Sequence, residues 1–301
     1  MNNQSQKFDL AKSYLGRPFA EGERFAVFHG DCVTELRRIP DGLIDLTVTS
    51  PPYNIGKEYE EISPLDEYIS WSTEWLREIF RVTTRTGALA LNVGYVSVPG
   101  KGKAVPLPYL LWNKTQFFLN QEIVWNYGAG VAARRSLSPR NEKVLWYVKN
   151  PEDYIFNLDS IRDPDVKYPN QKKNGKLRCN TIGKNPSDVW QIAKVTSGSG
   201  RSSVERAPHP AQFPRDLIDR IVSAFSNENH LVLDPFLGSG TSAESAIALD
   251  RFCIGFEKNL EYCSVAAERL SAFEAKEASR LFREGKPSSP QQTPDVQELF
   301  F

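Results

Sequence analysis

The sequence is poor in the residues that build metal centres and disulfide frameworks. Its 301 residues include only four cysteines and three histidines. No two cysteines form a C-x-x-C pair, and the histidines do not stand near them at metal-ligand spacing. We therefore expect no metal, and we expect reduced cysteines in a cytoplasmic protein.

Long apolar runs and an excess of one charge are also missing. The N-terminal segment lacks the apolar core of a signal peptide, and no window reaches the roughly 18 apolar residues that span a bilayer. No membrane partner is therefore expected. The 37 basic residues are balanced by 37 acidic ones, so an anionic partner would have to meet a local basic patch.

Residues 151–206 form such a patch. They are rich in Pro, Asn, Lys, Ser and Gly, and from Lys167 to Arg206 nine basic residues face two acidic ones. Lysine and arginine displace condensed counterions from nucleic acid, which favours a phosphate-binding surface; the alternative is a solvated insertion. The candidate phosphate contacts are Lys172, Lys173, Lys176, Arg178 and Arg201, with Arg134, Arg135 and Arg140 from an earlier loop.

Apolar strands and amphipathic helices alternate along the rest of the chain. The predicted strands are 25–32, 43–49, 87–94, 122–128, 143–150, 230–234 and 251–259. Helices are predicted at 65–82, from about 108 to 119, at 213–225, from about 241 and at 260–283. This alternation predicts an α/β fold with a mostly parallel sheet, whose ligands sit at the carboxyl ends of the strands.

A glycine-rich turn, DPFLGSGT, follows the strand that ends at Asp234, and Glu257 ends the next strand. Glycines let a ligand approach the backbone, and a second strand-end acid typically binds ribose hydroxyls. Neither G-x-G-x-x-G nor Gly-Lys-Ser/Thr is present. Asp234 would repel a pyrophosphate but could hold an ammonium group. The pattern therefore predicts S-adenosylmethionine, unless the glycines only form a tight turn.

A second motif, Ser50-Pro51-Pro52-Tyr53, directly follows the strand at 43–49. Together with DPFLGSGT it resembles the catalytic and cofactor motifs of the amino-group DNA methyltransferases, which methylate cytosine N4 or adenine N6. The catalytic block precedes the cofactor block and the basic segment lies between them, as in the circularly permuted β subclass of restriction-modification type. The resemblance covers roughly residues 25–150 and 207–270.

This resemblance implies a Rossmann-like S-adenosylmethionine-dependent methyltransferase fold with helices on both faces of a mixed sheet and an inserted target-recognition region. The expected division is an N-terminal arm at 1–24, a catalytic half at 25–150, the insertion at 151–206, a cofactor-binding half at 207–283 and a flexible tail at 284–301.

The resemblance also assigns the cofactor site. His209-Pro210-Ala211-Gln212-Phe213-Pro214 is similar to a family segment in which lysine usually stands at the place of Phe213. The expected cofactor-binding residues are Asp31, Cys32, His209, Pro210, Gln212, Asp234, Pro235, Phe236, Gly238, Ser239, Gly240, Thr241, Glu257 and Lys258.

For the chemistry, the block Ser50, Pro51, Pro52 and Tyr53 is expected to be catalytic. The lone pair of an aromatic amine is delocalised into its ring, and two acceptors, the Ser50 side chain and the Pro51 carbonyl, would localise it. Tyr53 would stack on a base flipped out of the duplex. Cytosine C5 methylation is excluded because no cysteine follows a proline.

Serine in the first position favours cytosine N4, with adenine N6 as the alternative. An RNA or protein amide methyltransferase and an inactive DNA-binding module are further alternatives. The expected partner is double-stranded DNA. A cognate restriction endonuclease and a homodimer, both common in this subclass, are implied by the resemblance alone.

Overall fold

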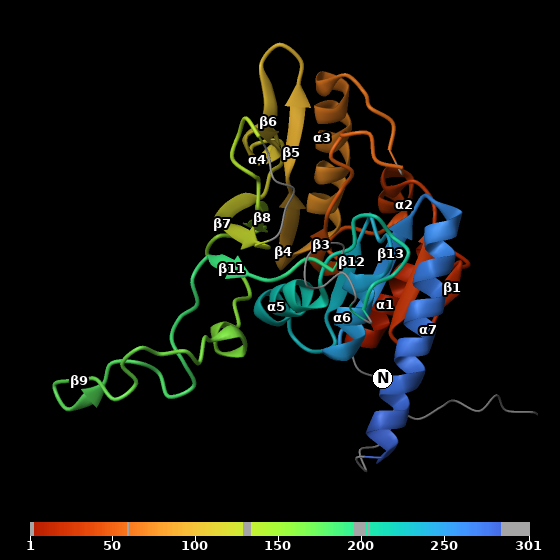
Figure 1. Cartoon of the computed structure of the whole chain (residues 1–301). Coiled ribbons are helices and arrows are strands. Elements are labelled where there is room, and N and C mark those ends of the chain that lie inside the picture. The colour runs from red at the N-terminus through yellow and green to blue at the C-terminus, as the bar shows by residue number, and fades with distance from the viewer. Residues whose placement is uncertain (1–2, 59, 129–133, 196–202, 204, 284–301) are drawn as a thin grey trace, which may run out of the picture.

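The structure, a computed structural model, describes residues 3–58, 60–128, 134–195, 203 and 205–283. Within this part of the chain, nine strands form one sheet in the order β1-β2-β13-β12-β3-β4-β8-β7-β11 (Figure 1). Their bounds, in that order, are Ala20–Glu21, Phe25–His29, Phe252–Glu257, Leu231–Asp234, Ile44–Thr49, Thr83–Val93, Asn141–Val148, Phe118–Asn126 and Val189–Gln191.

The centre of this sheet is parallel and its flanks are mixed. Strands β2, β13, β12, β3 and β4 all run in one direction. Strand β8 is antiparallel to both β4 and β7, whereas β11 runs parallel to β7. The predicted mixed, mostly parallel α/β sheet is confirmed. Since the parallel strands end at one edge, their polar tips are gathered there.

Helices cover both faces of the sheet, each over its own buried core. On one face lie α1 (Asn3–Leu15), α2 (Cys32–Arg38), α3 (Leu65–Val82) and the short α4 (Leu107–Leu111). On the other lie α5 (Arg215–Phe225), α6 (Thr241–Ala248) and α7 (Leu260–Arg283). The helix predicted at 65–82 is present with the same bounds. Trp75, Leu76 and Ile79 lie on its buried face, as their helical spacing predicts.

Two segments differ from the expectations. The N-terminal residues, expected to be an arm or a loose helix, form a packed helix: Phe8, Ala11 and Leu15 are buried at a spacing that places them on one helix face. The segment expected to be a loop and then a helix to about 119 contains the hairpin of β5 (Tyr95–Val98) and β6 (Gly102–Pro106), and α4 has only five residues.

The segment 151–206 is partly built into the body of the protein. The 3-10 helix η1 (Leu158–Ile161) packs against α5, and β11 extends the sheet. Between them, the hairpin of β9 (Lys172–Lys173) and β10 (Lys176–Leu177) extends away from the body (Figure 1). The segment therefore has a packed base and a protruding tip. The flexible tail expected at 284–301 lies outside the described residues.

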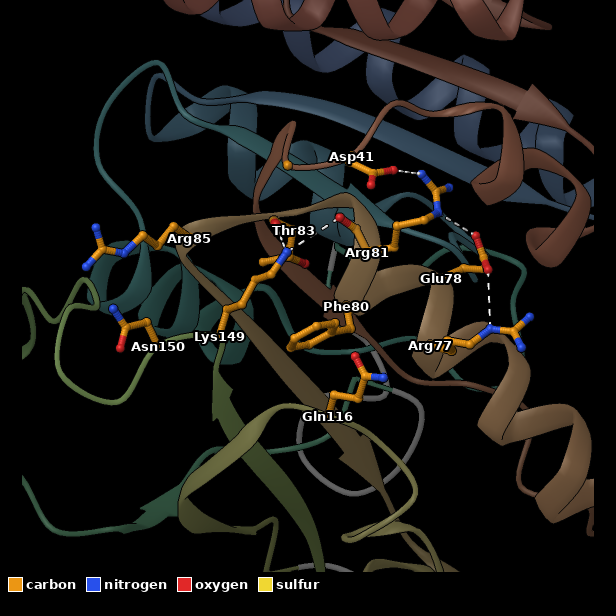
Figure 2. Close-up of a pocket in the computed structure, with 11 residues that line it drawn as sticks. Asp41, Arg77, Glu78, Phe80, Arg81, Thr83, Arg85, Gln116, Lys149 and Asn150 are labelled. Atoms are coloured by element: carbon orange, nitrogen blue, oxygen red, sulfur yellow. Dashed lines mark hydrogen bonds and ion pairs between the residues drawn. The ribbon is translucent and has the colours of Figure 1, made fainter.

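A basic cavity of about 690 Å³ opens at the opposite edge, where β3 and β4 begin (Figure 2). Arg81 donates to the carbonyls of Leu36 and Ile39 at the end of α2, at 2.8 Å each. Lys149 donates to the carbonyls of Arg81 and Thr83 at the end of α3. These two cations bind carbonyls at the carboxyl ends of α2 and α3, so their role in this cavity is structural.

Replacing Arg81 should therefore destabilise the fold. Arg81→Met removes the donors to both carbonyls at the end of α2, and we expect the free energy of unfolding to fall by about 2 kcal/mol. Arg85→Met is the matched control, because the Arg85 side chain in the same cavity is 78% exposed. Denaturant titration of both variants tests this, and equal stability of the two would contradict it.

Candidate active site

A cleft of about 1150 Å³ lies at the carboxyl ends of β2, β3, β4, β12 and β13. Both sequence motifs line it, although they are far apart in the chain. The predicted residues that line the cleft are Asp31, Cys32, Ser50, Pro51, Pro52, Tyr53, His209, Pro210, Gln212, Pro235, Phe236, Gly238, Ser239, Thr241, Glu257 and Lys258. The fold thus brings the catalytic and the cofactor candidates to one site.

Asp234 is not part of the cleft lining, contrary to its expected contact with an ammonium group. Its carboxylate is buried and accepts hydrogen bonds from the Thr49 hydroxyl at 2.7 Å, the Ser242 hydroxyl at 2.5 Å and the Phe236 N–H at 3.1 Å. Burial raises its pKa to about 6. This carboxylate joins the end of β3 to the glycine turn and to the start of α6.

Gly240 also faces away from the cleft. It has a left-handed backbone with φ of 85° before α6, and a Cβ there would meet Ala266 and Leu270 of α7. Gly238 does line the cleft, and a Cβ on it would lie 2.9 Å from His209 Nε2. Gly238 therefore permits the close packing of His209 on the turn, whereas Gly240 permits the packing of α6 on α7.

His209 places an uncharged imidazole in the cofactor half of the cleft. Burial and the nearby Arg269 lower its pKa to about 4. Its ring packs edge-on against Tyr262, with 4.5 Å between the centroids. A neutral ring and an aromatic neighbour suit the positively charged sulfonium of S-adenosylmethionine, which a charged imidazole would repel.

Two carboxylates at adjacent strand ends suit the hydroxyls of a nucleoside. Glu257, at the end of β13, accepts the N–H groups of Gly238 and Asn259, both at 2.8 Å. Asp31, after β2, accepts the N–H groups of Val33 and Thr34 as the N-cap of α2. Backbone donors thus fix both carboxylates in the cleft wall, where their remaining lone pairs can accept from ribose. This donor and acceptor set fits S-adenosylmethionine.

The described residues contain no group of three or more His, Cys, Asp or Glu side chains that could hold a metal ion. None of their helices is long and apolar enough to cross a bilayer.

The catalytic block is held by the loop that follows it. The Tyr68 hydroxyl donates to the Pro52 carbonyl at 2.7 Å. Asn54, with φ of 60°, exchanges two hydrogen bonds of 2.8 Å with the Ser63 backbone. Glu60 accepts the N–H groups of Asn54, Ile55 and Lys57. The backbone around Ser50-Pro51-Pro52-Tyr53 is therefore fixed before any substrate arrives.

A polar network behind this block was not predicted from the sequence. Tyr53 shares hydrogen bonds with Ser50 at 2.8 Å, Asn92 at 2.8 Å and Glu142 at 3.0 Å. Lys194 forms an ion pair of 2.7 Å with Glu142. All five side chains line the cleft. The one available signal was that Asn92 lies near the end of the strand predicted at 87–94, at the edge where ligands bind.

Aromatic rings form the neighbouring wall. Trp125 and Tyr127 both line the cleft and pack edge-on, with 5.4 Å between their centroids. The Lys194 ammonium lies 3.8 Å from the centre of the Tyr127 ring. Aromatic rings beside polar acceptors are the kinds of group with which enzymes stack and read a flipped base.

The expected phosphate contacts lie outside the cleft. Lys172, Lys173 and Lys176 are exposed on the protruding hairpin (Figure 1). Arg178 is exposed next to it, where it bonds Gln171 at 3.1 Å. The remaining residues of this group that the structure describes are also exposed, namely Arg134, Arg135 and Arg140. Arg201 lies outside the described residues.

The raised pKa of Asp234 predicts a pH-dependent cost. In the folded protein the Asp234 carboxyl group keeps its proton up to about pH 6, whereas the ordinary pKa of an aspartate is 3.8. Stability should therefore fall as pH rises through that window, by about 3 kcal/mol at one pKa unit per roughly 1.4 kcal/mol. Asp234→Asn lacks this titration. In denaturant titrations, the free energy of unfolding of the wild type, measured relative to that of the variant, should therefore be higher at pH 4 than at pH 7. A pH-independent difference between them would refute the raised pKa.

Comparisons with known proteins agree with this site. The DNA methylase family model for N6 and N4 enzymes matches residues 44–268. The chain is 56% identical to the type II methyltransferase M.ScaI of Streptomyces caespitosus, over 90% of this chain and 88% of that protein. It is 32% identical to the DNA adenine methyltransferase YhdJ of Escherichia coli (strain K12), over 86% of this chain and 88% of that protein.

A solved structure shares the fold. The PvuII DNA methyltransferase (cytosine-N4-specific) aligns with a TM-score of 0.67 at 18% identity, over 87% of this chain and 95% of that chain. The family match and the relatives confirm the resemblance inferred from the motifs: the chain belongs to the N6/N4 family of DNA methylases and is an amino-group DNA methyltransferase that uses S-adenosylmethionine.

Proposed function

We propose that the protein methylates the exocyclic N4 of cytosine at a fixed sequence in duplex DNA and so protects that site from a restriction endonuclease. The observation that carries the choice of base is the serine at the first position of the catalytic block, Ser50, which lines the cleft beside the cofactor turn. The cytosine-N4-specific fold neighbour supports the same choice.

Adenine N6 is the second candidate. One relative is a DNA adenine methyltransferase, and it covers most of this chain. Both target amines are exocyclic nitrogens on an aromatic ring, so the same two acceptors serve either base. The fold, the cofactor and the mechanism are common to the two candidates.

The chemistry begins with the position of the target amine. Bound S-adenosylmethionine supplies an electrophilic methyl group. The Ser50 hydroxyl and the Pro51 carbonyl, both on the rigid segment after β3, accept the two amine hydrogens and localise the nitrogen lone pair. The proline ring fixes the backbone of that carbonyl, so little rearrangement is needed during the reaction. Placing amine and methyl group in line supplies much of the rate.

The base reaches this site only outside the helix. An amine paired within a duplex is inaccessible, so the nucleotide has to flip into the cleft. Trp125 and Tyr127 offer an apolar wall for it, and Pro52 and Tyr53 form the side next to Ser50. Stacking on these rings would offset part of the stacking energy that the base loses when it leaves the duplex.

The proposed function also includes a DNA-recognition surface, a cellular location and partners. We place sequence recognition in the segment 151–206, with its hairpin lysines on the DNA backbone. A cytoplasmic location, a partner endonuclease and a homodimer accord with the proposed restriction-modification role.

The target atom can be identified by sequencing the DNA of a host that expresses the protein. We expect N4-methylcytosine at one consistent motif, absent from an empty-vector control. Ser50→Ala should bind S-adenosylmethionine normally while methylation slows by roughly 100-fold, because one acceptor is lost. N6-methyladenine at the motif would select the second candidate, and a fully active Ser50→Ala variant would refute the acceptor role.

Neutralising the hairpin should weaken DNA binding at every sequence. For Lys172→Gln, Lys173→Gln and Lys176→Gln combined, the slope of log K against log salt should become shallower by up to about 3, at roughly 0.9 per lost phosphate contact. A triple variant of Arg77, Arg85 and Lys276, which lie away from the cleft, is the control. Equal slopes for the two triple variants in fluorescence anisotropy titrations would place DNA elsewhere.

A further inference from the structure

A carboxylate, that of Glu142, lies behind the catalytic block and has no role in the chemistry proposed above. Glu142 is the second residue of β8, lines the cleft and has a side chain only 14% exposed. Its Oε2 accepts from the Tyr53 hydroxyl at 3.0 Å and from Asn92 Nδ2 at 2.8 Å. Its Oε1 accepts from Lys194 at 2.7 Å. Both oxygens are therefore engaged, and one of them leads to the catalytic block.

We infer that Glu142 is a positioning residue for the reacting amine. Acting through Tyr53, it orients the Ser50 hydroxyl so that the lone pairs of Ser50 face the substrate. This inference rests on the proposed function, since it explains how Ser50 acts as an acceptor.

The inference depends on the direction of the hydrogen bonds that join Glu142, Tyr53 and Ser50. An ionised carboxylate can only accept, so the single hydroxyl hydrogen of Tyr53 points at Glu142. The Asn92 carbonyl competes for that hydrogen at 3.3 Å, but the shorter bond to a charged acceptor is stronger. With its own hydrogen used, the Tyr53 oxygen accepts from Ser50 at 2.8 Å.

The consequence falls on Ser50. Its hydrogen is directed back toward Tyr53, which leaves its two lone pairs for other donors. Asn92 Nδ2, 3.5 Å from Ser50 Oγ, lies at the limit of hydrogen bonding and donates at 2.8 Å to the Tyr53 oxygen instead. The N–H of a target amine therefore meets an acceptor. Without the carboxylate, Tyr53 could donate to Ser50, and the serine hydrogen would then point toward the amine and oppose it.

Lys194 explains how a carboxylate is retained beside aromatic rings. A partly buried charge without a partner is costly, and the ammonium of Lys194 compensates it. The same ammonium lies over the Tyr127 ring, so one side chain fixes both the carboxylate and the aromatic wall. Lys194 comes from the 151–206 segment, and β11, just before it, fixes that part of the segment to the sheet.

A purely structural ion pair is the competing explanation. It would join β8 to the 151–206 segment and matter for stability alone. The two explanations differ in which measured quantity changes: positioning affects the rate of methyl transfer, whereas a structural role affects stability and binding.

The test is Glu142→Gln, which keeps the size of the side chain and removes its charge. We expect single-turnover methyl transfer to fall about 100-fold, as for a misplaced reacting group. The dissociation constants for DNA and S-adenosylmethionine and the 2-aminopurine signal of base flipping should match the wild type. The melting temperature should fall, because the Lys194 ammonium loses its ion pair, but the variant should remain folded at the assay temperature. Glu122→Gln is the control for loss of a carboxylate charge near this strand. Glu122 of β7 pairs with Lys143 of β8 at 3.5 Å, is more exposed than Glu142 and lies outside the cleft lining.

A double-mutant cycle shows whether the effect passes through Tyr53. Tyr53→Phe removes the intermediate hydroxyl, so we expect the double variant to be little slower than either single variant. Full activity of Glu142→Gln, a fall in stability or DNA affinity that accounts for the lost activity, or additive losses in the cycle would each overturn the inference. An inactive wild type would instead show that the proposed function is wrong.

Discussion

The buried carboxylate of Asp234 is the contact on which the active site depends. It accepts from Thr49 at the end of β3, from Ser242 in the first turn of α6 and from the backbone of the glycine turn. Those three groups belong to the catalytic half and to the cofactor half of the chain. Burying a carboxylate costs free energy, which three hydrogen bonds partly offset. One side chain thereby fixes the end of β3, which leads into Ser50, relative to the glycine turn and the start of α6.

The two edges of the sheet use their polar groups in opposite ways. At the amino edge, Arg81 donates to carbonyls at the end of α2. Lys149 donates to carbonyls at the end of α3 (Figure 2). At the carboxyl edge, Glu257 and Asp31 accept backbone N–H groups and also line the cleft. A group held in this way keeps lone pairs for a ligand. This difference, rather than charge or cavity size, separates the active site from the structural cavity.

Much of the fold and the location of the site could be predicted from the sequence, because those features are local. The central strands and α3 follow from apolar periodicity, and both motifs sit at strand ends. The orientation of Asp234 could not be predicted, since a strand-end acid can face a ligand or the core, and only the packing of Thr49 and Ser242 decides. The packing of α1 could not be predicted for a similar reason: Phe8, Ala11 and Leu15 make a buried face only when a sheet is there to receive them.

The network of Asn92, Glu142 and Lys194 was beyond sequence reasoning for a topological reason. Glu142 reaches β4 only because β8 runs antiparallel to it, and Lys194 reaches Glu142 only because β11 adds to the sheet beside β7. These contacts join residues about 50 positions apart or more in the sequence. They have a functional consequence if Glu142 acts as inferred. The segment assigned to DNA recognition then shares a side-chain network with Ser50, so that its placement on DNA and the orientation of the acceptor are linked by hydrogen bonds within one rigid edge of the sheet.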